Sequence, residues 1–153
     1  MKILAVFDGS DDGLAGLRVA ARLLREGGQR HEITAALVGW PPRRSPIWDR
    51  AFSKHPILDD LHRAMAEVAA AEFDRLKKVF EPIGNVTVEY LEGDPVSEIV
   101  GLIRRSNPEL FLAGLTRGID AESVTASAFA ILRQTAVPAL LTFGDPVGLE
   151  GSP

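Results

Sequence analysis

The sequence predicts an α/β protein built on a single doubly wound sheet of five parallel strands, with helices on both faces. Two observations carry this prediction. Five short runs rich in β-forming residues alternate with segments in which apolar residues recur at helical spacing. The first run, KILAVF, is apolar almost throughout. A β-α-β series of this kind favours one parallel sheet that helices cover on both sides.

The predicted strands are short runs that end near turn residues. They cover residues 2–7 (KILAVF), 32–38 (EITAALV), 86–91 (VTVEYL), 109–113 (ELFLA) and 137–143 (VPALLTF). Gly114 is expected to end the fourth strand, because glycine often marks the turn at which a strand stops.

Four stripes of apolar residues predict the helices between these strands. The stripes run over residues 14–24, 58–80, 96–103 and 124–132. Gly27-Gly28 is expected to end the first helix, and Pro82 and Gly84 to stop the second. The third opens with Asp94 as a plausible N-cap and Pro95 at the first helical position.

Length and composition describe a single domain of ordinary globular make-up, with 153 residues, 46% hydrophobic and 25% charged. We expect a domain over residues 1–144 and a tail over 145–153. The lack of cysteine excludes disulfides, thiolate metal sites and cysteine nucleophiles. The formal charge of −4 gives no general attraction to nucleic acid. No apolar run could span a membrane and the start does not resemble a secretory signal, so a cytoplasmic protein is expected.

One long irregular connection, residues 39–56, interrupts the alternation. It holds four of the ten prolines together with four cations and three large aromatic residues. The cations and aromatic residues are Arg43, Arg44, Arg50, Lys54, Trp40, Trp48 and Phe52. Loops this long inside a compact domain are usually functional or mobile. Two interpretations stay open: a solvated surface loop, or a basic lid over an anion or an acidic partner.

A ligand would sit at the carboxyl ends of the strands, where the winding of the sheet reverses. In the expected strand order 3-2-1-4-5, the loops DGSDDG (8–13) and GLTRG (114–118) flank that crevice. A glycine turn after a buried strand often binds phosphate, whereas the carboxylates of Asp120 and Glu122 repel it. At about 8 Å from a phosphate charge, each would cost roughly 2 kcal/mol at an effective dielectric near 20.

The DGSDDG loop has three interpretations. Its first half resembles a calcium loop, but the bidentate glutamate would fall on Val19, so that motif fails. A strand ending in Asp8 also resembles the haloacid dehalogenase phosphatases, yet Ser10 replaces their second aspartate, which leaves no proton carrier. In the structural interpretation, Ser10 or Asp11 caps a helix that starts near residues 12–13. Asp8 stays a candidate ligand.

Other catalytic and metal-binding patterns are missing from the sequence. It has no G-x-S-x-G nucleophile elbow and no Walker loop. The three histidines, His31, His55 and His62, lack zinc-ligand spacing and are expected to be solvated or locally bonded. No catalytic residue and no metal site is therefore predicted.

Four stretches, taken in order, resemble the universal stress protein family over nearly the whole chain. ILAVFDGSDDGLAGLRVA looks like the first strand, D-G-S turn and first helix of that family. EITAALVGWPP looks like its second strand and Pro-rich exit. YLEGDPVSEIVGLIRRSNPELFLAG is similar to its G-x-P helix opening and the strand that ends in glycine, and ILRQTAVPALLTF resembles its last helix and final strand.

The resemblance implies a sandwich of five parallel strands and helices, usually dimeric through the last strand. An exposed apolar edge strand also favours pairing with its own copy. The contact residues would be Val137, Ala139, Leu141 and Phe143. Many members bind ATP or AMP with a G-x2-G-x9-G-[ST] loop after strand four, and others lack the pattern and do not hold ATP. The resemblance assigns Asp8 to the nucleoside, the backbone of Val38 to adenine and Gly114 to the start of the loop.

The rest of the loop departs from the family pattern. Three residues separate Gly114 from Gly118 instead of two, so the second glycine position falls on Arg117. The closing Gly-Ser positions, counted back from the final strand, fall on Thr125 and Ala126. These two residues cannot freely take the positive φ of glycine, and a phosphate nest needs converging backbone N–H groups.

The sequence therefore predicts a non-catalytic, dimeric signalling or regulatory module of the stress response, with a degenerate nucleotide loop and an unidentified protein partner. One alternative is a member that binds ATP or AMP with Mg²⁺ and uses Arg117 and the basic 43–54 stretch in place of the missing glycines. A remote alternative is an enzyme of phosphate chemistry.

Overall fold

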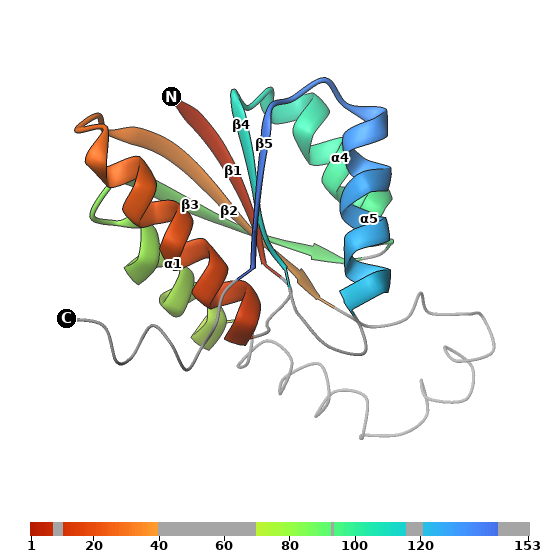
Figure 1. The fold of residues 1–153 in the computed structure, drawn as a ribbon, viewed down its shortest axis with the longest axis horizontal. Coiled ribbons are helices and arrows are strands. Elements are labelled where there is room, and N and C mark those ends of the chain that lie inside the picture. The colour runs from red at the N-terminus through yellow and green to blue at the C-terminus, as the bar shows by residue number, and fades with distance from the viewer. Residues whose placement is uncertain (8–10, 40–69, 93, 116–120, 144–153) are drawn as a thin grey trace, which may run out of the picture.

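The computed structural model describes residues 1–7, 11–39, 70–92, 94–115 and 121–143 of the 153-residue chain. Its labelled elements are, in chain order, β1 (Lys2–Phe7), α1 (Asp11–Glu26), β2 (His31–Gly39), β3 (Gly84–Glu92), α4 (Pro95–Ser106), β4 (Leu110–Leu115), α5 (Ala121–Gln134) and β5 (Ala139–Phe143) (Figure 1). A further helix over residues 70–80 precedes β3. The long loop beyond residue 39 and the 145–153 tail lie outside the described residues.

The strands form one parallel sheet in the order β3-β2-β1-β4-β5, which confirms the predicted fold class and strand order. β1 lies at the centre, where Ile3 pairs with Ile33 of β2 and with Leu110 of β4. β3 and β5 form the two edges. Because the strands are parallel, all their carboxyl ends lie at the same end of the sheet.

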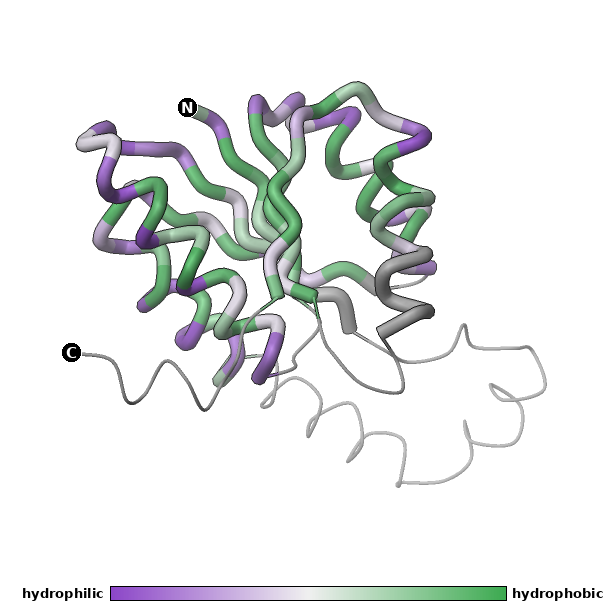
Figure 2. The backbone as a smooth tube through the Cα atoms, in the orientation of Figure 1, coloured by the Kyte–Doolittle hydropathy of each residue, from purple (hydrophilic) through white to green (hydrophobic). Residues whose placement is uncertain are grey.

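Side chains alternate between two separate cores on the two faces of the sheet. In β1, Ile3, Ala5 and Phe7 belong to one core, while Leu4 and Val6 belong to the other. The first core packs under α1 and the 70–80 helix, and the second under α4 and α5 (Figure 1). Figure 2 shows hydrophilic and hydrophobic residues alternating along α1, whose Leu14 and Leu17 are buried in the first core. Burial on both faces explains why β1 is apolar almost throughout.

The predicted start of α4 is confirmed in detail. Asp94 is the N-cap, and its carboxylate accepts a hydrogen bond of 2.9 Å from the backbone N–H of Ser97. Pro95 is the first helical residue, where its missing N–H has no helical partner to lose. The helix ends at Ser106, and its C-cap Asn107 takes the left-handed conformation with φ of 48° and donates its backbone N–H to the Ile103 carbonyl.

The start of α1 differs from the prediction, whereas its end does not. The helix begins at Asp11, so Asp11 lies within the first turn and does not cap a later start. Its carboxylate bonds to Arg75 of the 70–80 helix. The alternative cap, Ser10, lies outside the described residues. The helix ends at Glu26, directly before the predicted Gly27-Gly28 pair, and Gly28 has a φ of +70°.

Glycines allow α1 to pack directly against β4 and β5. A Cβ added to Gly114 would lie well inside van der Waals contact with the carbonyl oxygen of Gly13. One added to Gly16 would lie 2.7 Å from Oγ1 of Thr142. The prediction that Gly114 ends the fourth strand is wrong, because β4 continues through Leu115. The close approach of α1 to the sheet is what requires glycine at this position.

His31 begins β2 and is buried, with 6% of its surface exposed. Neither ring nitrogen has a hydrogen-bond partner within the part of the chain that the structure describes. The expectation of a solvated or locally bonded histidine is therefore wrong here. The period of β2 explains the burial, because Ile33 and Ala35 on the same strand face belong to the core under α1. His55 and His62 lie outside the described residues.

Candidate functional site

The carboxyl end of the sheet gathers the strands that the sequence assigns to ligand binding. β1 ends at Phe7, β2 at Gly39 and β4 at Leu115. α1 and α5 both begin at this end, and they lie on opposite faces of the sheet (Figure 1). Three predicted ligand residues, Asp8, Arg117 and Gly118, lie outside the described residues. Asp8 directly follows β1 in the sequence.

Val38 lies in β2, where it pairs with Leu91 of the edge strand β3. The pairing of β2 with the central strand ends one residue earlier, where Leu37 lies beside Phe7. The backbone of Val38 is therefore at the place where the β1 ladder stops. This is the strand end at which a crevice opens in a doubly wound sheet.

Gly114 is held in β4 and lies beside Thr142 of β5. The backbone carbonyl of Gly13 packs directly against Gly114 and leaves no space for a side chain there. A glycine in a phosphate loop is normally explained by positive φ or by close approach to the anion. Gly114 has a packing reason of its own, so its presence is no sign of a phosphate site.

Thr125 and Ala126 lie inside α5 rather than at its start. The helix begins at Ala121, so these two residues are the fifth and sixth of the helix. In an α-helix only the first four N–H groups lack a partner in the preceding turn. Counted from the N-cap position before Ala121, the free N–H groups within α5 therefore belong to residues 121–123. A phosphate at this helix start would meet those groups, and not the backbone of the pair counted from the sequence.

Acidic residues occupy the start of each labelled helix at this end of the sheet. α1 has Asp11 and Asp12 in its first turn, and α4 has Asp94 as its cap. In the sequence, Glu122 is the second residue of α5 and Asp120 directly precedes the helix. Carboxylates are favourable at helix N-termini because they bond free N–H groups and face the positive end of the dipole. A phosphate would compete for the same groups.

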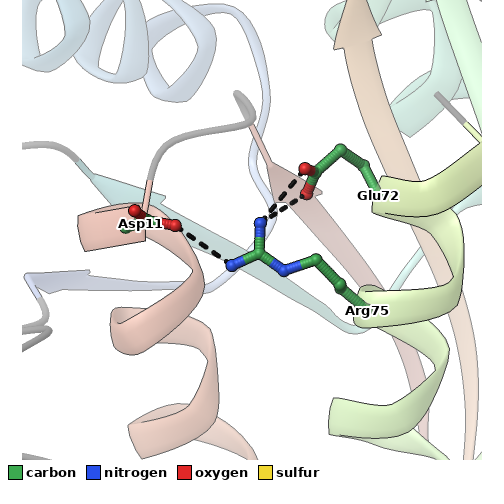
Figure 3. Close-up of polar contacts among 3 residues, drawn as sticks. All are labelled: Asp11, Glu72 and Arg75. Atoms are coloured by element: carbon green, nitrogen blue, oxygen red, sulfur yellow. Dashed lines mark hydrogen bonds and ion pairs between the residues drawn. The ribbon is translucent and has the colours of Figure 1, made fainter. Parts of the chain in front are cut away.

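One of these carboxylates is neutralised by a cation from a neighbouring helix. Arg75 donates to Asp11 at 3.0 Å and to both carboxylate oxygens of Glu72 at 3.1 Å (Figure 3). The hydrogen bond to Asp11 is the largest of the effects that raise the pKa of Arg75 above its ordinary value, and Glu72 adds to it. Arg75 is therefore a permanent cation that ties the start of α1 to the 70–80 helix.

The residues predicted at the dimer contact divide into two kinds. Ala139 and Phe143 of β5 are exposed, with 42% of the Phe143 surface accessible. Val137 and Leu141 are half-buried against the core under α4 and α5. β5 begins at Ala139, two residues later than predicted, and it is an edge strand as expected. Leu141 thus contributes to the fold in addition to any contact with a second chain.

One group of residues that the sequence interpretation missed is basic. Five cations gather along α1 and the 70–80 helix: Arg18, Arg22, Arg25, Arg75 and Lys78. The i, i+4, i+7 spacing of the three arginines in α1 could have indicated this group from the sequence, because it places them on one helix face.

Among the described residues, no three His, Asp or Glu side chains come together as a metal site. Within the same ranges, no helix is long and apolar enough to cross a membrane.

Comparison with known proteins gives a consistent family. A model of the universal stress protein family matches residues 1–141 of the chain. None of the curated proteins that were compared matches it.

Several solved structures share the fold. The universal stress protein UspA from Lactobacillus plantarum is 18% identical, with a TM-score of 0.68, and the match covers 93% of this chain and 97% of that one. A universal stress protein in complex with cAMP is 15% identical, with coverages of 95% and 98% and a TM-score of 0.58. One from Archaeoglobus fulgidus in complex with dAMP is also 15% identical, with coverages of 92% and 95% and a TM-score of 0.51.

Proposed function

Since the chain belongs to the universal stress protein family, we propose that it is a non-catalytic, dimeric regulatory module of the stress response whose nucleotide loop no longer holds ATP. It would work in the cytoplasm through contacts with a protein partner. The observation that carries the proposal is the start of α5. The residues at the closing loop positions, Thr125 and Ala126, lie in the second turn of the helix, where their N–H groups bond to the preceding turn.

Electrostatics support the same proposal. The helix starts at the carboxyl end of the sheet carry Asp11, Asp12 and Asp94, and Glu122 and Asp120 stand at the start of α5 in the sequence. Of these, Asp11 is paired with Arg75. A triphosphate would bring several negative charges into this acidic neighbourhood. A carboxylate about 8 Å from a phosphate charge costs roughly 2 kcal/mol.

The absence of catalysis is part of the proposal. The ion pairs that Arg75 makes with Asp11 and Glu72, and that Arg105 makes with Glu89, join a carboxylate to an always-charged arginine, which is not itself a general acid or base. General acid–base chemistry needs a positioned proton carrier whose pKa is matched to its task. Turnover assays with ATP and simple phosphomonoesters test this point, and steady hydrolysis would favour the remote enzyme alternative.

Calorimetry on the natural protein and on a loop-repaired variant tests the proposal. The repair deletes one residue between Gly114 and Gly118, inserts three neutral residues after Gly118, and introduces Thr125→Gly and Ala126→Ser. Asp120→Asn and Glu122→Gln remove the repulsion. The recovered N–H contacts and the removed repulsion should make the free energy of Mg-ATP binding about 2–4 kcal/mol more favourable. This corresponds to a roughly 30- to 1000-fold gain in affinity.

The two titrations separate the possible causes. We expect no low-micromolar Mg-ATP binding by the natural protein, and a clear gain on repair. A variant that carries only Asp120→Asn and Glu122→Gln isolates the charge contribution from the backbone contribution. If the natural protein already binds Mg-ATP at low micromolar concentration, the degenerate-loop proposal is wrong. If neither protein binds, the crevice itself is closed and the loop is not the cause.

The second candidate is an ATP- or AMP-binding member of the family. Two universal stress proteins with the same fold are in complex with cAMP and with dAMP, and Val38 lies where the β1 ladder ends. In this case Arg117 and the cations of the 43–54 stretch would replace the missing glycines. Should the natural protein bind a nucleotide, Arg117→Ala is expected to weaken binding tenfold or more, and an unchanged affinity would remove Arg117 from the site.

A further inference from the structure

A groove of about 610 Å³ lies between α1 and the 70–80 helix, which run side by side over one face of the sheet (Figure 1). Five cations from the two helices line it, Arg18, Arg22, Arg25, Arg75 and Lys78, and we call these its walls. Four apolar residues complete the lining, Ala21, Val79, Pro82 and Ile83, and we call these its floor. No acidic residue is among the described residues that line it. We call this feature the basic groove.

Most of these cations have no ion-pair partner in the part of the chain that the structure describes. Arg75 is paired with Asp11 and Glu72. The other four, Arg18, Arg22, Arg25 and Lys78, have no ion pair with any residue that the structure describes. This concentration of positive charge stands out in a chain whose formal net charge is −4.

The spacing of the arginines works against the stability of α1. Arg18, Arg22 and Arg25 follow one another at i, i+4 and i+7, so they lie on the same helix face. Like charges at these spacings repel each other and destabilise the helix. Lys78 faces them from the other wall of the groove and adds to the repulsion. An anionic partner that enters the groove would relieve this repulsion.

We propose that the basic groove docks an acidic amphipathic helix of a protein partner. Arg18 and Arg25 are seven residues apart, which is about 10.5 Å along α1 and two helical turns. A partner helix can present apolar side chains to the floor and carboxylates to both walls along that length. A single phosphate fits less well, because phosphate sites need donors that converge on one point, and these cations are spread along the groove.

This inference goes beyond the proposed function, since it names the surface and the chemistry of the partner. It does not depend on the nucleotide loop, because the groove lies between two helices over a face of the sheet. Binding of Mg-ATP and binding of an acidic helix are therefore separate measurements, and either can fail without the other.

The test is fluorescence anisotropy with a labelled peptide made of four repeats of Leu-Glu-Glu-Leu, titrated with the full chain at about 0.1 M salt. The Arg18→Glu/Arg22→Glu variant is expected to bind it at least tenfold more weakly than the natural protein. The control is Arg104→Glu/Arg133→Glu, which makes the same charge change at two exposed residues of α4 and α5. It should change the affinity less than threefold.

Two further peptides separate the contributions of charge and apolar contact. Replacing every glutamate by glutamine, or every leucine by serine, should weaken binding to the natural protein, because both walls and floor are used. Circular dichroism confirms that each variant is folded, and Arg22→Gln repeats the test if the double variant is not.

The proposal is overturned by equal binding of the natural protein and the groove variant, or by an equal loss in the control variant. It is also overturned if the natural protein binds inorganic polyphosphate but none of the acidic peptides, because the groove would then serve phosphate chains.

Discussion

Gly114 has no room for a side chain, because the backbone of α1 lies directly against it at Gly13. The sequence interpretation assigned this glycine to a nucleotide loop, and residue type alone could not separate the two reasons. Only the three-dimensional contact shows that packing of α1 on β4 is sufficient to require glycine. The same holds for His31, which was expected to be solvated or locally bonded although the period of β2 places it in the core.

Gly114→Ala is expected to lower the free energy of unfolding by roughly 3 kcal/mol, because the methyl group meets backbone that cannot rotate away. Gly101→Ala in α4 is the matched control, since its added Cβ would find only the end of the Arg105 side chain, at 3.9 Å. That change should stabilise the helix by about 1 kcal/mol. Chemical denaturation measures both, and equal effects would show that the α1–β4 contact is not tight.

His31→Leu is expected to raise the free energy of unfolding by about 1 kcal/mol. The ring is buried and neither nitrogen has a partner among the described residues, so an apolar side chain removes an unsatisfied polar group. Denaturant unfolding at neutral pH is the measurement. A loss of stability on this substitution would mean that the ring nitrogens are satisfied by a buried water.

At the scale of elements, the sequence predicted most of the boundaries because local chemistry decides them. Asp94 and Pro95 open α4 as expected, and Gly27-Gly28 follows the last residue of α1. The departures arise from tertiary contacts. β4 runs past Gly114 because it pairs with β5, and Asp11 joins α1 while its carboxylate reaches Arg75 on another helix.

Arg75→Met should lower the free energy of unfolding by about 1 kcal/mol, which is the upper end of the range for partly exposed ion pairs. The reason is that Arg75 bonds two carboxylates while its side chain is 40% exposed. Arg105→Met is the control, since Glu89 is the one ion-pair partner of Arg105 among the described residues and the Arg105 side chain is 55% exposed. This substitution should lower the stability by half as much or less. Thermal denaturation of the two variants gives the comparison, and an equal cost would contradict a special role for Arg75.

The pH dependence of the Arg75 contribution follows from the direction of its pKa shift. Its pKa is raised, chiefly by the hydrogen bond to Asp11. The stabilisation is therefore fully present below the unfolded value and is lost only as pH rises through the raised folded value, far above neutral. The difference between Arg75→Met and the natural protein should stay constant from roughly pH 6 to 9. A difference that falls within that range would point to another titrating group.

At the scale of the whole molecule, the fold class and strand order followed from the alternation of strands and helices. The residues of the candidate site could be predicted less well from the sequence. Asp8, Arg117 and Gly118 depend on loops whose shape the local sequence does not determine, and Thr125 and Ala126 were located by counting along the chain. The basic groove depends on two helices that are distant in sequence, so only the arginine spacing in α1 could have pointed to it.

The edge strand β5 leads to a prediction about assembly. If two chains pair through β5, then Ala139→Asp places a charge on an exposed position of that edge and should weaken the dimer at least tenfold. Thr87→Asp makes the same kind of change on the opposite edge strand, β3, and should leave the dimer intact. Ala139 is preferable to Leu141, because Leu141→Asp also disturbs the core. Light scattering at tens of micromolar measures the mass, and a single-chain mass for the natural protein contradicts the prediction.

Native mass spectrometry of the freshly purified protein tests both parts of the proposed function at once, because one spectrum reports both assembly and bound ligand. We expect a species of twice the 16.5 kDa chain mass, with no added nucleotide. A dimer whose mass is increased by one ATP or AMP per chain would contradict the degenerate-loop proposal and favour the nucleotide-binding candidate.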